Sequence, residues 1–115
     1  MIPVPSRSRV WLATGHTDMR KGFDWLAALV QDHLHHEPFS GQTFVFRGRA
    51  GRLIKVLWWD GQGLCLFSKR LEKGRFVWPG TAGAAVALSP AQLAMLLEGI
   101  DWRAPERTDR PRIAG

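Results

Sequence analysis

The sequence predicts an α+β fold in which an antiparallel β-meander of four to six short strands packs with two helices. Apolar residues recur at helical spacing between positions 19 and 34. Short runs rich in Val, Phe, Trp and Leu follow, separated by Gly-containing turns. A chain of 115 residues can bury a core without disulfides or a metal. We expect one α+β domain over residues 1–103 and a disordered basic tail over 104–115.

The first expected elements are a strand over residues 9–13 and one long amphipathic helix. Thr17 or Asp18 supplies a short side-chain oxygen that can cap the free N–H groups at the helix start. Five apolar residues then recur at spacings that place them on one helical face. They are Met19, Phe23, Leu26, Val30 and Leu34.

Four strands are expected next, over residues 43–47, 53–59, 64–69 and 75–78. The turns between them contain GRAG, DGQG and LEKG. Residues 85–88 can form a further short strand.

A second, short helix is expected near the C-terminal end. Ser89 is its N-cap, Pro90 occupies its first position and Gln92 completes a capping box. Gly99 closes it.

The alternation of side chains assigns the two faces of the meander. We pair Trp59 with Leu64 and Phe46 with Leu53 across their turns. One face then carries Phe44, Phe46, Leu53, Lys55, Leu57, Trp59, Leu64 and Leu66. The other carries Val45, Arg47, Ile54, Val56, Trp58, Cys65, Phe67, Lys69, Phe76 and Trp78.

Both faces are largely apolar, which is unusual for a meander with one wet side. Two helices can cover both faces. Alternatively, the face that carries Trp58, Phe67 and Trp78 receives a partner, either another protein chain or unstacked bases. These three residues are our candidate partner interface, and burial in the core is the alternative.

The chain is basic, with 16 Lys and Arg against 10 Asp and Glu and a net charge of +6. This balance favours association with a polyanion. Cations gather around the predicted turns and at the start of the first helix, where they oppose the helix dipole. The candidate phosphate contacts are Arg20, Lys21, Arg47, Arg49, Arg52, Lys55, Lys69, Arg70, Lys73 and Arg75.

No catalytic, metal-binding or cofactor-binding residues are predicted. Two-metal chemistry needs converging carboxylates, and the acidic residues are scattered over caps and turns. The histidines between 33 and 36 lack a second cluster to complete a metal site. The single Cys65 fits a reducing cytoplasm, and no apolar run approaches the length of a membrane span.

Four segments resemble one protein family. They are GHTDMRKGFDWLAALV, FVFRGR, IKVLWWDGQGLCLFSKRLEKGRFVWP and LSPAQLAMLLEGIDW. Together they resemble the TnpB accessory protein, also called Orf2-like, of bacterial insertion sequences of the sixty-six family. The resemblance implies a role in DNA transposition beside a larger transposase encoded by the same element. It supplies no active-site residues.

Residues and resemblance together predict a non-catalytic accessory factor that binds DNA, or the transposase–DNA complex, through basic hairpin turns. The alternative is a module that docks on the transposase through an apolar sheet face and never contacts DNA. A nuclease is a third reading, which the scattered carboxylates disfavour. The sequence is also compatible with a homo-oligomer.

Overall fold

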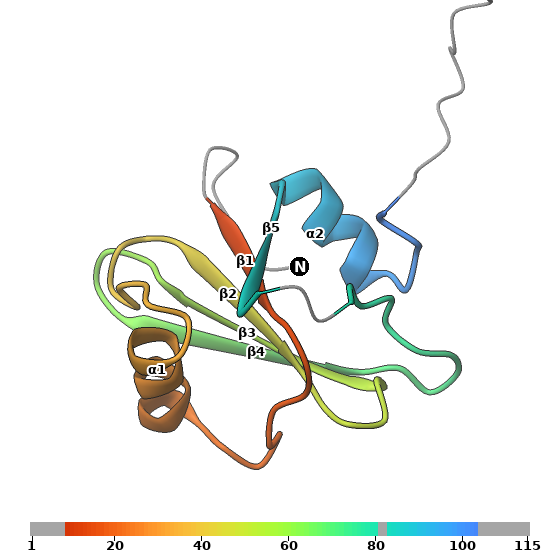
Figure 1. The fold of residues 1–115 in the computed structure, drawn as a ribbon, viewed down its shortest axis with the longest axis horizontal. Helices are drawn as coiled ribbons and strands as arrows, with labels where there is room; N and C mark the ends of the chain where they lie inside the picture. The colour runs from red at the N-terminus through yellow and green to blue at the C-terminus, as the bar shows by residue number, and fades with distance from the viewer. Residues whose placement is uncertain (1–8, 81–82, 104–115) are drawn as a thin grey trace, which may run out of the picture.

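A computed structural model describes residues 9–80 and 83–103 (Figure 1). The predicted tail over 104–115 lies outside the described residues. The α+β class is confirmed, with five strands and two helices. In chain order these are β1 (Val10–Ala13), α1 (Phe23–Asp32), β2 (Thr43–Arg47), β3 (Leu53–Trp59), β4 (Leu64–Arg70), β5 (Ala85–Leu88) and α2 (Pro90–Leu97).

The strands form one mixed sheet in the order β4-β3-β2-β1-β5. β2, β3 and β4 are antiparallel neighbours, and β5 is antiparallel to β1. β1 and β2 pair in parallel, however, so the expectation of a purely antiparallel meander is wrong at this point. Parallel neighbours need a crossover connection, and α1 lies within the one that joins them.

The first helix is shorter than predicted, spanning the ten residues Phe23–Asp32. Neither Thr17 nor Asp18 caps it, because Gly22 is the N-cap and no side chain caps the first turn. The Asp18 carboxylate instead accepts hydrogen bonds from the backbone and guanidinium of Arg20. Arg20 and Lys21 therefore precede the helix, and Asp18 offsets the charge of Arg20.

The stretch 75–78 does not form the predicted strand. After β4 the chain turns across the end of the sheet, where the Phe76 amide donates to the Gly51 carbonyl. Phe76 is buried, and Trp78 donates its indole N–H to the Ala13 carbonyl. These side chains fill the core beneath the sheet, so their backbone does not extend it.

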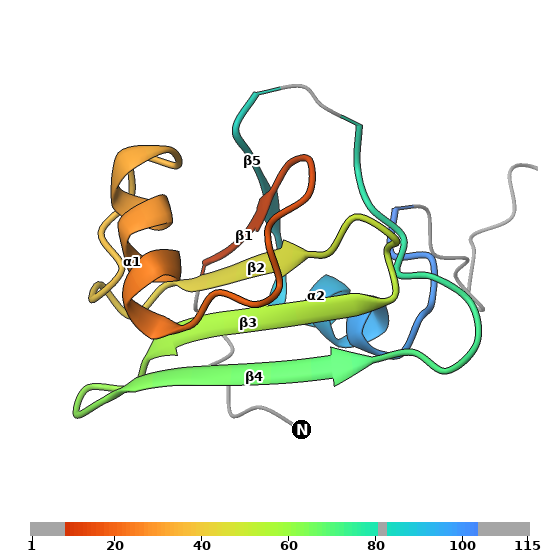
Figure 2. The same cartoon turned by 90° about the horizontal axis from the view of Figure 1, so that it is seen from below.

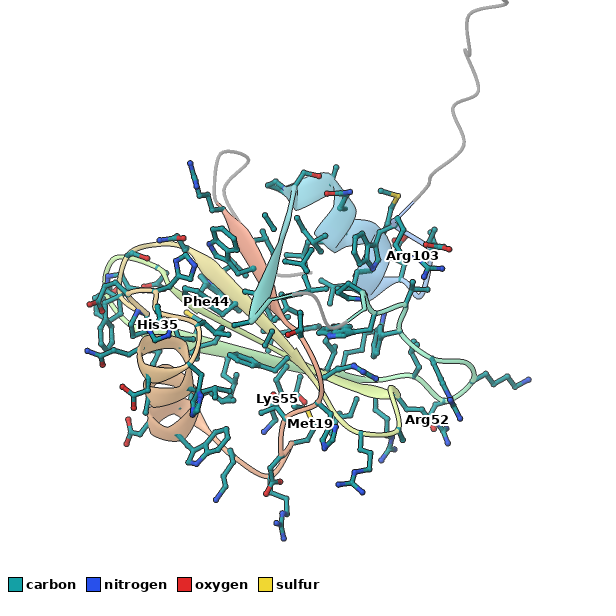
Figure 3. All side chains as sticks on the ribbon, in the orientation of Figure 1. Met19, His35, Phe44, Arg52, Lys55 and Arg103 are labelled. Atoms are coloured by element: carbon teal, nitrogen blue, oxygen red, sulfur yellow. The ribbon has the colours of Figure 1, made fainter. Side chains whose placement is uncertain are left out.

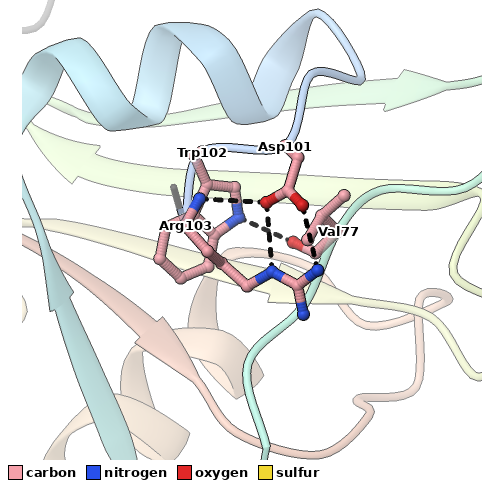
Figure 4. Close-up of polar contacts among 4 residues, drawn as sticks. All are labelled: Val77, Asp101, Trp102 and Arg103. Carbon is pink, nitrogen blue, oxygen red and sulfur yellow. Dashed lines mark hydrogen bonds and ion pairs between the residues drawn. The ribbon is translucent and has the colours of Figure 1, made fainter. Parts of the chain in front are cut away.

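The second helix forms as predicted. The Ser89 side chain accepts from the Gln92 amide, and the Gln92 side chain accepts from the Ser89 amide, which completes the capping box. Gly99 follows the helix with a φ of 76°. The chain then returns to the sheet, where the Trp102 indole donates to the Val77 carbonyl at 2.8 Å (Figure 4).

The two helices cover opposite faces of the sheet (Figures 1 and 2). Leu26, Ala27 and Val30 of α1 pack on the face that carries Phe44 and Phe46. Leu93, Leu96 and Leu97 of α2 pack on the face that carries Val45, Val56 and Trp58. The side chains lie on the predicted faces, and of the two alternatives for covering these faces the structure shows a helix packed on each.

One predicted register is off by two residues. Trp59 pairs with Leu64 as expected, but Phe46 pairs with Lys55 and not with Leu53. A shift of two residues leaves every side chain on its predicted face, because the side-chain period of a strand is two.

Within the residues that the structure describes, neither helix is long and apolar enough to cross a membrane.

Candidate functional site

A groove runs along one end of the sheet, between the turn that joins β2 to β3 and the loop before α1. It consists of two adjoining hollows of about 610 and 390 Å³, which share Met19, Gly48 and Arg49. Figure 3 places Met19 on the loop and Arg52 beside the turn. We call this surface the basic groove. Its walls are formed by His16, Thr17, Asp18, Met19, Arg20, Trp25, Leu29, Gly48, Arg49, Ala50, Arg52, Leu53, Arg70 and Glu72.

Two glycines shape the turn that forms one wall. Gly51 has a φ of 75°, a backbone conformation that residues other than glycine rarely adopt. Gly48 lies against the loop, and a Cβ placed on it would come within 2.9 Å of Met19 Cγ. The turn and the loop therefore approach closely because Gly48 has no side chain.

The opposite wall is the loop that connects β1 to α1. The Thr17 amide donates to the Arg47 carbonyl at 2.8 Å, which ties this loop to the end of β2. The Asp18 carboxylate pairs with the Arg20 guanidinium at 2.8 Å. The Arg20 side chain, followed by its backbone amide, lowers the pKa of Asp18 well below its usual range. Asp18 is therefore charged at neutral pH and offsets one groove cation.

The groove carries four arginines and two carboxylates. Arg70 forms an exposed ion pair with Glu72 at 3.1 Å. Arg52 donates to the backbone carbonyls of Leu71 and Glu72 and forms no ion pair with a described carboxylate. Arg49 is exposed and has no hydrogen bond or ion pair to any described residue. The groove therefore has an excess of positive charge, and Arg49 is the groove arginine without a hydrogen bond or ion pair to a described residue.

Two further predicted cations lie next to this groove. Lys73 and Arg75 are exposed on the segment after β4. Arg75 lies beside the turn, because its side-chain carbons would be 3.6 to 3.8 Å from a Cβ on Gly51. The turn and this segment thus present their cations at the same end of the sheet.

Three of the remaining predicted cations have side chains that are engaged within the protein. Lys55 donates to the Lys21 carbonyl at 2.8 Å and holds β3 to the loop before α1. Lys69 donates to the Leu97 carbonyl at the C-terminal end of α2, where a cation is favourable. Arg47 donates to the Gly15 carbonyl, and its guanidinium lies 5.7 Å from the Trp78 ring centroid.

The three residues of the predicted partner interface lie beneath α2. Trp58 is only 7% exposed and belongs to the core. Phe67 and Trp78 are half-buried and pack against the same cluster. Much of this sheet surface is therefore packed against the chain itself, whereas Phe67 and Trp78 keep part of their surface accessible.

Sequence reasoning missed the aromatic residue that the groove does expose. Trp25 projects from α1 with 42% of its surface accessible, and the Lys21 ammonium lies 5.6 Å from its ring centroid. The sequence did offer one signal, because Trp25 lies in the predicted helix but outside its apolar stripe. Met19 also lines the groove, although the sequence assigned it to the helix.

The other reactive side chains that the structure describes form no converging site. Among the described residues, no group of three or more His, Cys, Asp or Glu side chains could hold a metal ion. The Gly63 and Gln62 amides, with the Cys65 thiol, lower the pKa of Asp60. Desolvation, together with Asp60, raises the pKa of Cys65, which opposes activation of the thiol as a nucleophile.

Comparison with known proteins identifies a family. The family model described as IS66 Orf2 like protein matches residues 8–107. The chain is 60% identical to the uncharacterized protein y4hO of Sinorhizobium fredii (strain NBRC 101917 / NGR234) over the full length of both chains. It is 38% identical to the uncharacterized protein y4jC of the same strain, covering 90% of this chain and 89% of the relative. No solved structure matches it significantly. The chain belongs to the IS66 Orf2-like proteins, a family associated with insertion sequences.

Proposed function

We propose that this protein is a non-catalytic accessory factor of insertion-sequence transposition that binds DNA through the basic groove. The DNA would be bound either alone or together with the transposase of the same element. The observation that carries the proposal is Arg49, an exposed guanidinium where the two hollows meet. It has no partner among the described residues, so its donors are free for a phosphate.

The neighbouring cations support the same proposal. Arg20 and Arg70 are exposed and pair with Asp18 and Glu72 at the surface. A phosphate can compete for such cations. Arg52 completes the set at the foot of β3.

The Arg49→Gln variant tests the proposal directly. At about 20 mM salt, counterion release contributes about 2 kcal/mol per phosphate contact, so we expect the variant to bind duplex DNA of the element end about thirtyfold more weakly. The logarithmic salt slope should become shallower by about 0.9. Fluorescence anisotropy of a labelled duplex measures both quantities.

Arg9→Gln is the matched control. It removes the same charge from an exposed arginine whose carbonyl accepts from the Thr43 amide, at the opposite end of β2 from the groove. Binding by this variant should stay within about twofold of the wild type, since distant exposed charges are screened. Equal effects of both variants, or no binding of the wild type at low salt, would refute DNA binding through the groove.

The alternative, docking on the transposase through an apolar sheet face, has less support from the geometry. Both faces are covered by helices, and Trp58 is buried. The DNA proposal is therefore the one that the geometry supports best.

A further inference from the structure

The exposed indole in the basic groove belongs to neither buried core cluster of the described residues. Trp25 lies in the first turns of α1, and its neighbours Leu26 and Ala27 supply the buried contacts to the sheet. Its side chain lines the larger hollow of about 610 Å³ and also a smaller one of about 130 Å³. A large aromatic side chain that lines two open hollows is available to a ligand.

The surroundings of Trp25 combine a flat apolar surface with cations. Leu29 and Met19 extend the apolar wall, while Arg20 and Arg49 line the same hollow. Lys21 adds an ammonium 5.6 Å from the centroid of the indole. A nucleotide needs this combination, because its base stacks on an aromatic face while its phosphate contacts cations.

The size and charge of the hollow narrow the class of ligand. A volume of about 610 Å³ lies in the range of sites that bind small molecules, so a single nucleotide fits. Bases within a duplex are stacked on each other and present no free face to an indole. Only a nucleotide outside the duplex stack can use Trp25. The excess of arginines over carboxylates favours such a nucleotide over an apolar peptide segment.

We propose that Trp25 is a stacking site for an unpaired nucleobase, with Arg20 and Arg49 contacting its flanking phosphates. The preferred ligand is therefore DNA with unpaired nucleotides, either a single strand or a duplex with an overhang. This inference rests on the proposed function and names the form of DNA that the groove prefers.

The test compares three DNA probes of about 20 nucleotides in fluorescence anisotropy: a single strand, a blunt duplex, and a duplex with an overhang of about four nucleotides. Trp25→Ala should weaken binding of the single strand and the overhang about five- to 150-fold, the range set by the loss of one stacked base. Blunt-duplex binding should change less than about twofold. Trp25→Phe keeps an aromatic face and should retain most of the preference.

Phe39→Ala is the matched control, because Phe39 is 53% exposed and lies beside Trp59, away from the groove. It should leave all three affinities unchanged. Circular dichroism of each variant checks that the fold is intact, which we expect because neither side chain belongs to a buried core cluster.

The outcomes separate this inference from the proposed function. If Arg49→Gln weakens duplex binding while Trp25→Ala spares the single strand, the stacking site is wrong and the DNA groove stands. If the wild type binds none of the probes, the proposed function fails with it. If Trp25→Ala abolishes co-purification with the transposase and leaves all DNA affinities unchanged, the hollow holds a protein segment and the inference is overturned.

Discussion

The close approach of Gly48 to Met19 makes a prediction about how the groove is assembled. A Cβ at Gly48 would lie 2.9 Å from Met19 Cγ, whereas ordinary van der Waals contact begins at 3.4 Å. In Gly48→Ala the Met19 side chain must therefore move by about half an ångström. Overpacking costs about 1–3 kcal/mol, and the flexibility of Met places the expected loss near 1 kcal/mol. The backbone adds no strain, because the φ of Gly48 is not positive.

A double-mutant cycle isolates this contact. In a Met19→Ala background the obstructing Cγ is absent, so Gly48→Ala should cost almost nothing, giving a coupling free energy of about 1 kcal/mol. Urea denaturation of the wild type, both single variants and the double variant supplies the four free energies of unfolding. The same variants should alter DNA affinity, since Gly48 and Met19 line both hollows.

Gly63→Ala is the control for the glycine substitution itself. Gly63 lies in another hairpin turn, has no positive φ, and nothing lies within 4 Å of an added Cβ. The hydrogen bond from its backbone amide to the Asp60 carboxylate is kept in the variant. Stability should stay constant or rise by about 0.4–1 kcal/mol, because the unfolded chain loses freedom. Equal costs of Gly48→Ala with and without Met19 would refute the steric account.

Three further predictions concern charge and core. Asp18→Asn removes a carboxylate from the groove and releases Arg20, so DNA affinity should rise and the salt slope steepen by up to about 0.9, measured by anisotropy; weaker binding would contradict this. Asp60→Asn should destabilise the protein at pH 7. The folded-state pKa of Asp60 is lowered, so its charge stabilises the fold at pH values above the unfolded-state pKa. The difference in free energy of unfolding between the variant and the wild type should therefore vanish as the pH falls through the folded-state pKa. Urea titrations at a series of pH values measure this difference. Trp58→Ala should lose about 3–5 kcal/mol of stability because the ring is buried. A urea midpoint of this variant equal to that of the wild type would show that Trp58 does not stabilise the core.

Local patterns in the sequence carried much of the fold. The Ser89–Gln92 capping box forms as predicted because both of its partners lie within one helical turn. The alternation of apolar residues assigned both sheet faces correctly even though Phe46 pairs two residues away from its predicted partner. These features depend on neighbours in the chain, which a sequence displays.

Two predictions failed, each for a different reason. The Asp18 carboxylate could cap a helix, yet it binds Arg20 nearby and the helix begins only after Gly22. The strand–helix–strand order of β1, α1 and β2 is typical of a parallel pair of strands. The prediction of an antiparallel meander did not take this order into account.

Burial decided which basic residues are available. Lys55 and Lys69 look like solvent-facing cations in an alternating strand, but each reaches a backbone carbonyl from another element. Arg49 and Arg52 sit in a turn and remain at the surface, as turn residues usually do. Their juxtaposition with Trp25 could not be read from the sequence, because it depends on how the loop before α1 packs against Gly48.

The strength of the groove bears on why such a protein would act as an accessory factor. At about 0.15 M salt each phosphate contact contributes about 1 kcal/mol through counterion release. Three to five contacts, as the cations of the groove and its rim allow, then give about 3–5 kcal/mol, which corresponds to dissociation constants around the millimolar range. A groove of that strength holds little free DNA. It becomes effective when another protein presents the DNA at an effective concentration of about a millimolar, as a transposase bound to the same molecule would. Binding to free DNA at physiological salt as tight as nanomolar would therefore require contacts beyond this groove.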